Sequence, residues 1–191
     1  RVGRNIALPA DCKVIRADGK RVYPGLVEAY SNLGLVEINS VRATVDYREV
    51  GDNNANVRAV AAFNPDSEII PVNRSNGILL AVSAPSGGTI AGRSSMMMLD
   101  GWTWEDMTLQ ADVGMHISWP RSDEGISEIE GFVSDARRYL EAVTNGKTQP
   151  RDLRLESLAR VLDGSLPIIV DATSLNQIRS AVSFASQEGL R

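Results

Sequence analysis

The stretch PGLVEAYSNLGLVEI, residues 24–38, indicates which fold the chain adopts. A proline and a glycine mark the start of a new element, and the apolar run at residues 26–29 is compatible with a short strand buried on both faces. Tyr30 and Asn32 follow, two positions apart. Because residues i and i+2 of a strand point to the same side, we expect these two side chains to meet at the carboxyl end of this strand.

Around this stretch, the pattern is rich in strands up to residue 120 and rich in helices after it. Residues 12–25 form two β-like runs around an Asp-Gly turn, and residues 41–65 hold a polar turn and then a helix-like run that ends before a proline. After residue 120, apolar side chains recur at steps of three and four, which is typical of an amphipathic helix. The alternation indicates an α/β chain. We expect further strands at 78–84, 94–99, 114–119 and 166–170, and helices at 126–143, 152–162 and 174–188, the last with Ser174 as its N-cap.

Several segments together resemble the amidohydrolase superfamily. There, the run that corresponds to residues 24–38 reads approximately PGLIDAHSHLG and contains a His-x-His pair. The segment LPIIVDATSLNQIRSAVSFASQEGL, residues 166–190, resembles the family's fifth strand and the helix after it. Three more segments resemble a bacterial imidazolonepropionase-like subgroup: NPDSEIIPVNRSNGILLAV (64–82), PSGGTIAGRSS (85–95) and LDGWTWEDM (99–107).

The resemblance implies a partial TIM-like (β/α) amidohydrolase barrel that follows a remnant of an N-terminal β-sandwich. Residues 1–23 would be the end of the sandwich or a linker, and residues 24–191 the N-terminal part of the barrel. An open part of a barrel exposes strand edges and apolar faces. We therefore expect a partner for this surface, either another protein chain or a C-terminal half of the same protein.

The resemblance also implies a degenerate metal site, because Tyr30, Asn32 and Asp171 stand where the family has histidine ligands. A phenol with a pKa of about 10 and a neutral amide are much poorer metal ligands than imidazole. The three side chains could still hold Mg²⁺ or Ca²⁺ through oxygen, but such sites usually contain more than one carboxylate. We favour a hydrogen-bonded polar cluster and expect no cofactor.

Four other residues are candidates for a pocket: His116, Arg93, Trp102 and Trp104. His116 is the only histidine, and strand alternation puts it on the face opposite Met115. It could act as a general base, although a hydrogen-bonded structural role is favoured. Arg93 replaces the lysine of a P-loop in GGTIAGRS, but the segment after it is too short for the phosphate-binding helix. The tryptophans could line an apolar groove, although core packing is the commoner explanation.

Composition excludes some kinds of partner but leaves the cellular compartment open. The 191 residues are 43% hydrophobic and 23% charged, as in ordinary globular proteins. A net charge of −4 without any run of Lys or Arg argues against nucleic acid. A single cysteine, Cys12, excludes a disulfide within these residues, and no apolar run approaches the ~18 residues of a transmembrane helix. Related bacterial proteins often carry export signals, which makes a periplasmic location plausible beside a cytoplasmic one.

Two functions compete at this stage. The substituted ligand positions favour a catalytically degenerate amidohydrolase-like protein, a pseudoenzyme that serves as a binding or structural subunit of a larger protein or complex. The alternative is a metal-dependent hydrolase of C–N bonds in an amide or cyclic amide, with a competent site completed by residues outside this chain. Only the second function requires Zn²⁺ or another divalent metal.

Overall fold

A computed structural model describes residue 3 and residues 6–191 of the chain. Its centre is a five-stranded sheet with the strands in chain order. The pairs β1/β2 and β4/β5 are parallel, whereas β3 is antiparallel to both of its neighbours. The strands are β1 (Leu26–Ser31), β2 (Ile78–Ser83), β3 (Ile90–Met98), β4 (Thr108–Ser118) and β5 (Ile168–Asp171).

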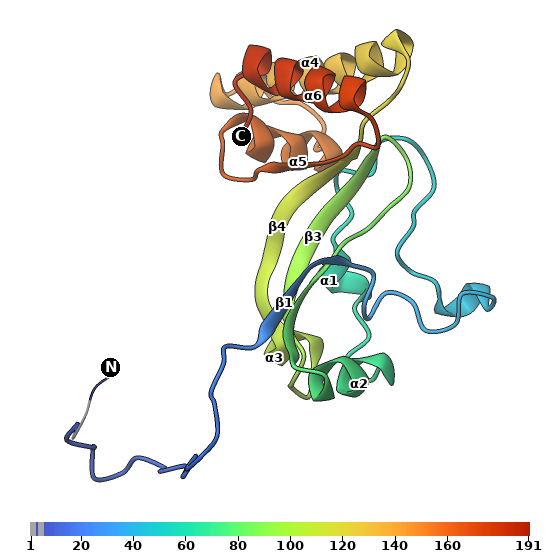
Figure 1. Cartoon of the computed structure of the whole chain (residues 1–191). Coiled ribbons are helices and arrows are strands. Elements are labelled where there is room, and N and C mark those ends of the chain that lie inside the picture. The colour runs from blue at the N-terminus through green and yellow to red at the C-terminus, as the bar shows by residue number, and fades with distance from the viewer. Residues whose placement is uncertain (1–2, 4–5) are drawn as a thin grey trace.

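The three longest helices gather at one end of the sheet (Figure 1). Figure 1 shows α4, α5 and α6 gathered near one end of the long strands β3 and β4, with α2 and α3 near the other end. Across the described ranges, none of the helices combines the length and the apolar character needed to cross a membrane. The helices are η1 (Arg42–Thr44), α1 (Ala59–Ala62), α2 (Ile69–Ser75), α3 (Trp104–Met107), α4 (Asp123–Thr144), α5 (Leu153–Leu162) and α6 (Leu175–Glu188).

Strand direction brings the carboxyl ends of four strands to the same end of the sheet, which we call its carboxyl edge. Because β3 is antiparallel to both β2 and β4, these two strands run the same way, and β1 and β5 run with them. The last residues of β1, β2, β4 and β5 therefore lie at a common edge, where barrels and open α/β sheets place their ligand sites.

The sheet is curled into a half-barrel. Tyr30 on β1 and His116 on β4 are separated by two intervening strands, which corresponds to about 14 Å across a flat sheet. Their ring centroids are only 5.6 Å apart. Side chains of a flat sheet stand roughly perpendicular to it and do not converge, so the face that carries these two rings is concave.

The main core lies between β4 and the three helices α4, α5 and α6. Met115, Ile117 and Trp119 alternate along the chain and are at most 3% exposed. They pack in one cluster with apolar residues that include Ile129 of α4 and Phe184 of α6. The predicted alternation is thus confirmed.

A second apolar cluster lies toward the other end of the sheet. Ala81 of β2 and Met97 of β3 pack there with Val60 of α1, Ile70 of α2 and Met107 of α3. Both strand residues are fully buried. The two short helices α1 and α2 are therefore stabilised by packing rather than by their own length, which is too short for independent stability.

The predicted elements after residue 25 are confirmed in type, with differences at their ends. Two strands begin earlier than their apolar patterns indicate: β3 at Ile90 and β4 at Thr108. The backbone pairing of β3 and β4 continues through the polar residues Arg93 and Gln110, which break the apolar pattern. Ser174 is the predicted N-cap of α6, and its hydroxyl accepts a hydrogen bond from the Gln177 N–H at 3.3 Å.

The two β-like runs expected in residues 12–25 are wrong. These residues form no strand, almost all are exposed, and Figure 1 shows the amino-terminal segment leading away from the sheet. The expected turn is present, since Lys20 N–H donates to the Ala17 carbonyl at 2.9 Å. A two-stranded hairpin without a packing surface is marginal in water, and here no neighbouring strand or helix supplies that surface.

The main core generates a stability prediction. Ile129→Ala removes a side chain that is 0% exposed, so the free energy of unfolding should fall by about 2–5 kcal/mol. Val143→Ala on the same helix is the matched control, because Val143 is 50% exposed and its loss should cost under about 0.5 kcal/mol. Urea denaturation followed by circular dichroism measures both. Equal losses would contradict the placement of α4.

Candidate functional site

Three polar side chains converge at the carboxyl edge of the sheet: the Tyr30 phenol from β1, the His116 imidazole from β4 and the Asp171 carboxylate from β5. The two rings are tilted by 34° with centroids 5.6 Å apart. Asp171 is close enough for its charge to favour the protonated form of both groups. The structure therefore brings two of the three predicted ligand positions together with the only histidine of the chain.

An irregularity in β1 sets the position of Tyr30. Glu28 pairs with Ala81 and Ser31 pairs with Ser83, so three steps along β1 match two steps along β2. The Tyr30 N–H donates to Oε1 of Glu28 at 3.2 Å. Bulges of this kind re-aim side chains and are frequent beside functional sites. The phenol therefore takes its direction from the bulge as well as from strand alternation.

Asn32 does not lie on the strand. β1 ends at Ser31, so strand alternation applies to Tyr30 and not to Asn32. Asn32 is exposed, and its carbonyl accepts the Leu35 N–H at 2.9 Å in the turn that follows. Both residues nevertheless line the same pocket of about 420 Å³, whose walls also come from α2 and the start of β2.

His116 is buried without a visible partner for one ring nitrogen. It is 5% exposed, and within the described part of the chain its Nε2 atom has no hydrogen-bond partner. Burial lowers the pKa of His116 from 6.5 to about 4, and the opposing charge of Asp171 offsets this only in part. The imidazole is therefore neutral at pH 7. Nε2 makes no hydrogen bond within the described residues, so the structural role favoured from the sequence stays a prediction.

A glycine opposite His116 allows the segment before α1 to lie close against β3. Gly92 pairs with His116 across the β3–β4 ladder and has a φ of 124°. A Cβ atom at Gly92 would lie 2.9 Å from both the Cβ and the carbonyl oxygen of Val57. Any larger residue would push the segment before α1 away from the strand that flanks the imidazole.

A buried glutamine fixes the turn between β5 and α6. Gln177 Nε2 donates to the Trp119 carbonyl at 2.6 Å, and its Oε1 accepts from the Thr173 N–H at 3.2 Å. The Trp119 N–H in turn donates to the Asp171 carbonyl at 2.9 Å. These bonds hold the end of β5 beside the end of β4. Sequence reasoning missed Gln177, although Ser174-x-x-Gln177 has the spacing of a capping box.

The donor set does not match that of a catalytic zinc centre. Burial and the charge of Asp171 raise the pKa of Tyr30 above its ordinary 10.0, so the phenol stays neutral at pH 7. Asn32 offers only an amide, which leaves Asp171 as the one carboxylate of the three positions. Among residues 3 and 6–191, no group of three or more His, Cys, Asp or Glu side chains is placed to hold a metal ion. The side chains of this chain do not by themselves fit such an ion.

The remaining candidates do not join His116 in one pocket. Arg93 lies on the helix-covered face of the sheet, where it forms an ion pair with Asp112 at 3.1 Å. Trp102 and Trp104 lie at the turn into α3 and are 88% and 42% exposed, so core packing is wrong for Trp102. The stretch GGTIAGRS enters β3 at Ile90 rather than a helix, which agrees with a glycine-rich loop.

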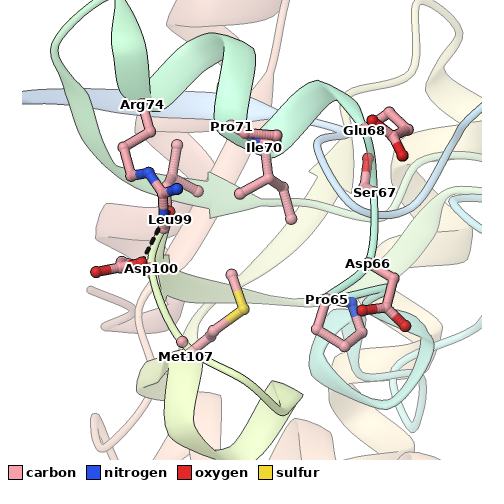
Figure 2. Close-up of a pocket in the computed structure, with 11 residues that line it drawn as sticks. Pro65, Asp66, Ser67, Glu68, Ile70, Pro71, Arg74, Leu99, Asp100 and Met107 are labelled. Carbon is pink, nitrogen blue, oxygen red and sulfur yellow. Dashed lines mark hydrogen bonds and ion pairs between the residues drawn. The ribbon is translucent and has the colours of Figure 1, made fainter.

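Figure 2 shows a different pocket, of about 220 Å³, at the opposite edge of the sheet where β3 ends. Arg74 of α2 donates to the Leu99 carbonyl at 3.2 Å and to the Asp100 carboxylate. Ser67 is buried and donates to Glu37 at 2.9 Å. Arg74 and Ser67 thus have partners among the described residues, unlike Nε2 of His116 at the carboxyl edge of the sheet, which we call the strand-end site.

Comparison with known proteins supports the fold. No protein-family model and no curated protein sequence matches the chain. An amidohydrolase of known structure from Thermotoga maritima MSB8 is similar, with a TM-score of 0.90 and 22% sequence identity. The similarity covers 100% of this chain and 55% of that protein, so the chain spans about half the length of the amidohydrolase it matches. The chain therefore has the fold of part of an amidohydrolase.

The burial of His116 predicts its titration. Since it is the only histidine, its ring protons can be followed by NMR without ambiguity, and we expect a midpoint at about 4. The folded imidazole binds a proton less readily than the unfolded one, so stability is lost as the pH falls from 6.5 toward 4. The loss should be roughly 3 kcal/mol.

The control for this titration is His116→Phe, which keeps an aromatic ring and removes the titratable nitrogen atoms. Urea denaturation at pH 7 and at lower pH should show this component of the pH dependence in the unmodified protein and its disappearance in the variant. A midpoint near 6.5 would contradict the burial of the imidazole.

Proposed function

We propose that this chain is a catalytically degenerate amidohydrolase-like protein that acts as a binding or structural subunit of a larger protein or complex. The observation that carries the proposal is the set of groups at the three ligand positions: a neutral phenol, a neutral amide and one carboxylate. A catalytic zinc site needs at least three good ligands and an open position for water. Tyr30, Asn32 and Asp171 do not supply them.

The same groups suit the binding of a polar ligand. The Nε2 atom of His116 has no partner in the described part of the chain, and an unmet polar group in a buried place carries a cost that a ligand hydrogen bond would remove. The negative charges of Glu28, which lines the neighbouring pocket, and of Asp171 favour a neutral or cationic ligand. The proposal therefore includes a binding role for the strand-end site.

The competing function is metal-dependent hydrolysis of C–N bonds. It is supported by the fold and by two donors that remain at the edge, His116 Nε2 and the Asp171 carboxylate. The chain spans 55% of the similar amidohydrolase, so further ligands would have to come from residues outside this chain. In that case the metal would activate water for attack on an amide or cyclic amide.

Metal analysis separates the two functions. We expect the purified protein to contain far less than one Zn, Mn or Fe per chain by inductively coupled plasma mass spectrometry, because only one of the three ligand positions, Asp171, carries a good metal ligand. Added Zn²⁺ should not produce hydrolysis of an amide or cyclic imide. Stoichiometric metal together with hydrolysis that a chelator abolishes would overturn the proposal.

The matched variant is Asp171→Asn, which keeps the size of the side chain and removes its charge. It should leave the measured metal content unchanged, because no metal depends on that carboxylate. A loss of bound metal in this variant, but not in Asp163→Asn on the surface after α5, would place a metal ion at the strand ends.

A further inference from the structure

A second polar cluster lies on the other face of the sheet, where three guanidinium groups surround one carboxylate. Asp112 of β4 is bonded by Arg160 of α5 at 2.6 Å, by Arg93 of β3 at 3.1 Å and by Arg58 at 3.3 Å. Arg93 pairs with Met115 in the β3–β4 ladder, and Met115 packs into the core under the helices. The cluster is therefore separate from His116 and does not rest on the proposed function.

The cluster lines a pocket with an excess of positive charge. The pocket has a volume of about 480 Å³, which is within the usual range for small-molecule sites. Four arginines and two carboxylates line it, which leaves a formal charge of 4 − 2 = +2. The charged residues are Arg58, Arg93, Arg151, Arg160, Asp112 and Glu156.

The excess positive charge lies at the opening of the pocket, above a buried Arg93–Asp112 ion pair. The side chains of Arg93 and Asp112 are only 11% and 12% exposed, whereas those of Arg160 and Arg58 are 39% and 44% exposed and border the opening. In the described part of the chain, Nε of Arg93 has no hydrogen-bond partner. One carboxylate cannot neutralise three guanidinium groups, so Arg58 and Arg160 present uncompensated positive charge that an anion from solvent can reach.

Asp112 remains ionised inside the cluster. Burial alone would raise the pKa of Asp112, but the hydrogen bond from Arg160 and the neighbouring guanidinium charges outweigh burial and lower that pKa. The formal charge of +2 already includes Asp112 as an anion. Arg151 is held separately by Glu156, with bonds of 2.8 Å and 3.0 Å.

We propose that this arginine pocket binds a phosphate-type dianion, either as the free ion or as the phosphate group of a small molecule. Planar guanidinium groups match the geometry of phosphate oxygens and bind them through paired charge-assisted hydrogen bonds. A dianion would neutralise the formal excess of the pocket. The half-exposed Arg58 and Arg160 would contact the dianion near the opening. The buried Arg93 would attract it from the inner wall of the pocket.

Isothermal titration calorimetry with inorganic phosphate at constant ionic strength tests this site. We expect saturable binding, and Arg160→Gln and Arg58→Gln should each raise Kd by about tenfold or more, because each removes a charge-assisted contact. The control Arg138→Gln removes an arginine of α4 that is 74% exposed and paired within its own helix. It should leave Kd unchanged. No saturable binding, or the same Kd in Arg160→Gln as in the unmodified protein, would overturn the proposal.

Removal of the Asp112 carboxylate, which competes with phosphate for the arginines, should strengthen phosphate binding rather than weaken it. Asp112→Asn raises the formal charge of the pocket from +2 to +3, so it should tighten phosphate binding and make the variant more dependent on phosphate for thermal stability. Weaker binding in the folded variant would count against the site. A phosphate monoester titrated in parallel identifies the source: tighter binding than inorganic phosphate indicates a ligand that carries the group, and equal or weaker binding indicates the free ion.

Discussion

The alternation of side chains along β4 is the constraint on which the rest of the structure depends. Met115 and Ile117 enter the core under the helices, and this fixes the intervening His116 on the concave face. A shift of one residue in the register would exchange the two sets and place an imidazole in the apolar core. The pairing of β4 with β3 on one side and β5 on the other prevents that shift.

The two faces of β4 handle buried charge in opposite ways. On the concave face, His116 has one anion nearby, and burial wins, so the pKa falls to about 4 and the ring stays neutral. On the helix-covered face, Asp112 has three guanidinium partners at 2.6–3.3 Å, and these bonds outweigh burial, so the carboxylate stays ionised. The number of direct partners decides which effect is larger.

The sequence predicted the elements better than the sites, for physical reasons. Apolar periodicity reports which residues face a core, so the bounds of α4, α5 and α6 could be predicted closely. Apolar periodicity does not show whether a segment will pair with another strand. This is why the strands expected before residue 26 were wrong. It also does not report contacts across the sheet: the meeting of Tyr30 with His116 depends on the curl, and Asp112 collects arginines from three distant segments.

The same distinction limits what the fold says about chemistry. A TM-score of 0.90 at 22% identity means that a backbone can be kept while most side chains change, because packing tolerates apolar exchange when volume and pattern are retained. Metal catalysis is more demanding, since each ligand must present a suitable donor atom at a defined place. A change of a few side chains near the strand ends can therefore alter the chemistry of a site without disturbing the fold. The function has to be argued from those side chains rather than from the backbone that carries them.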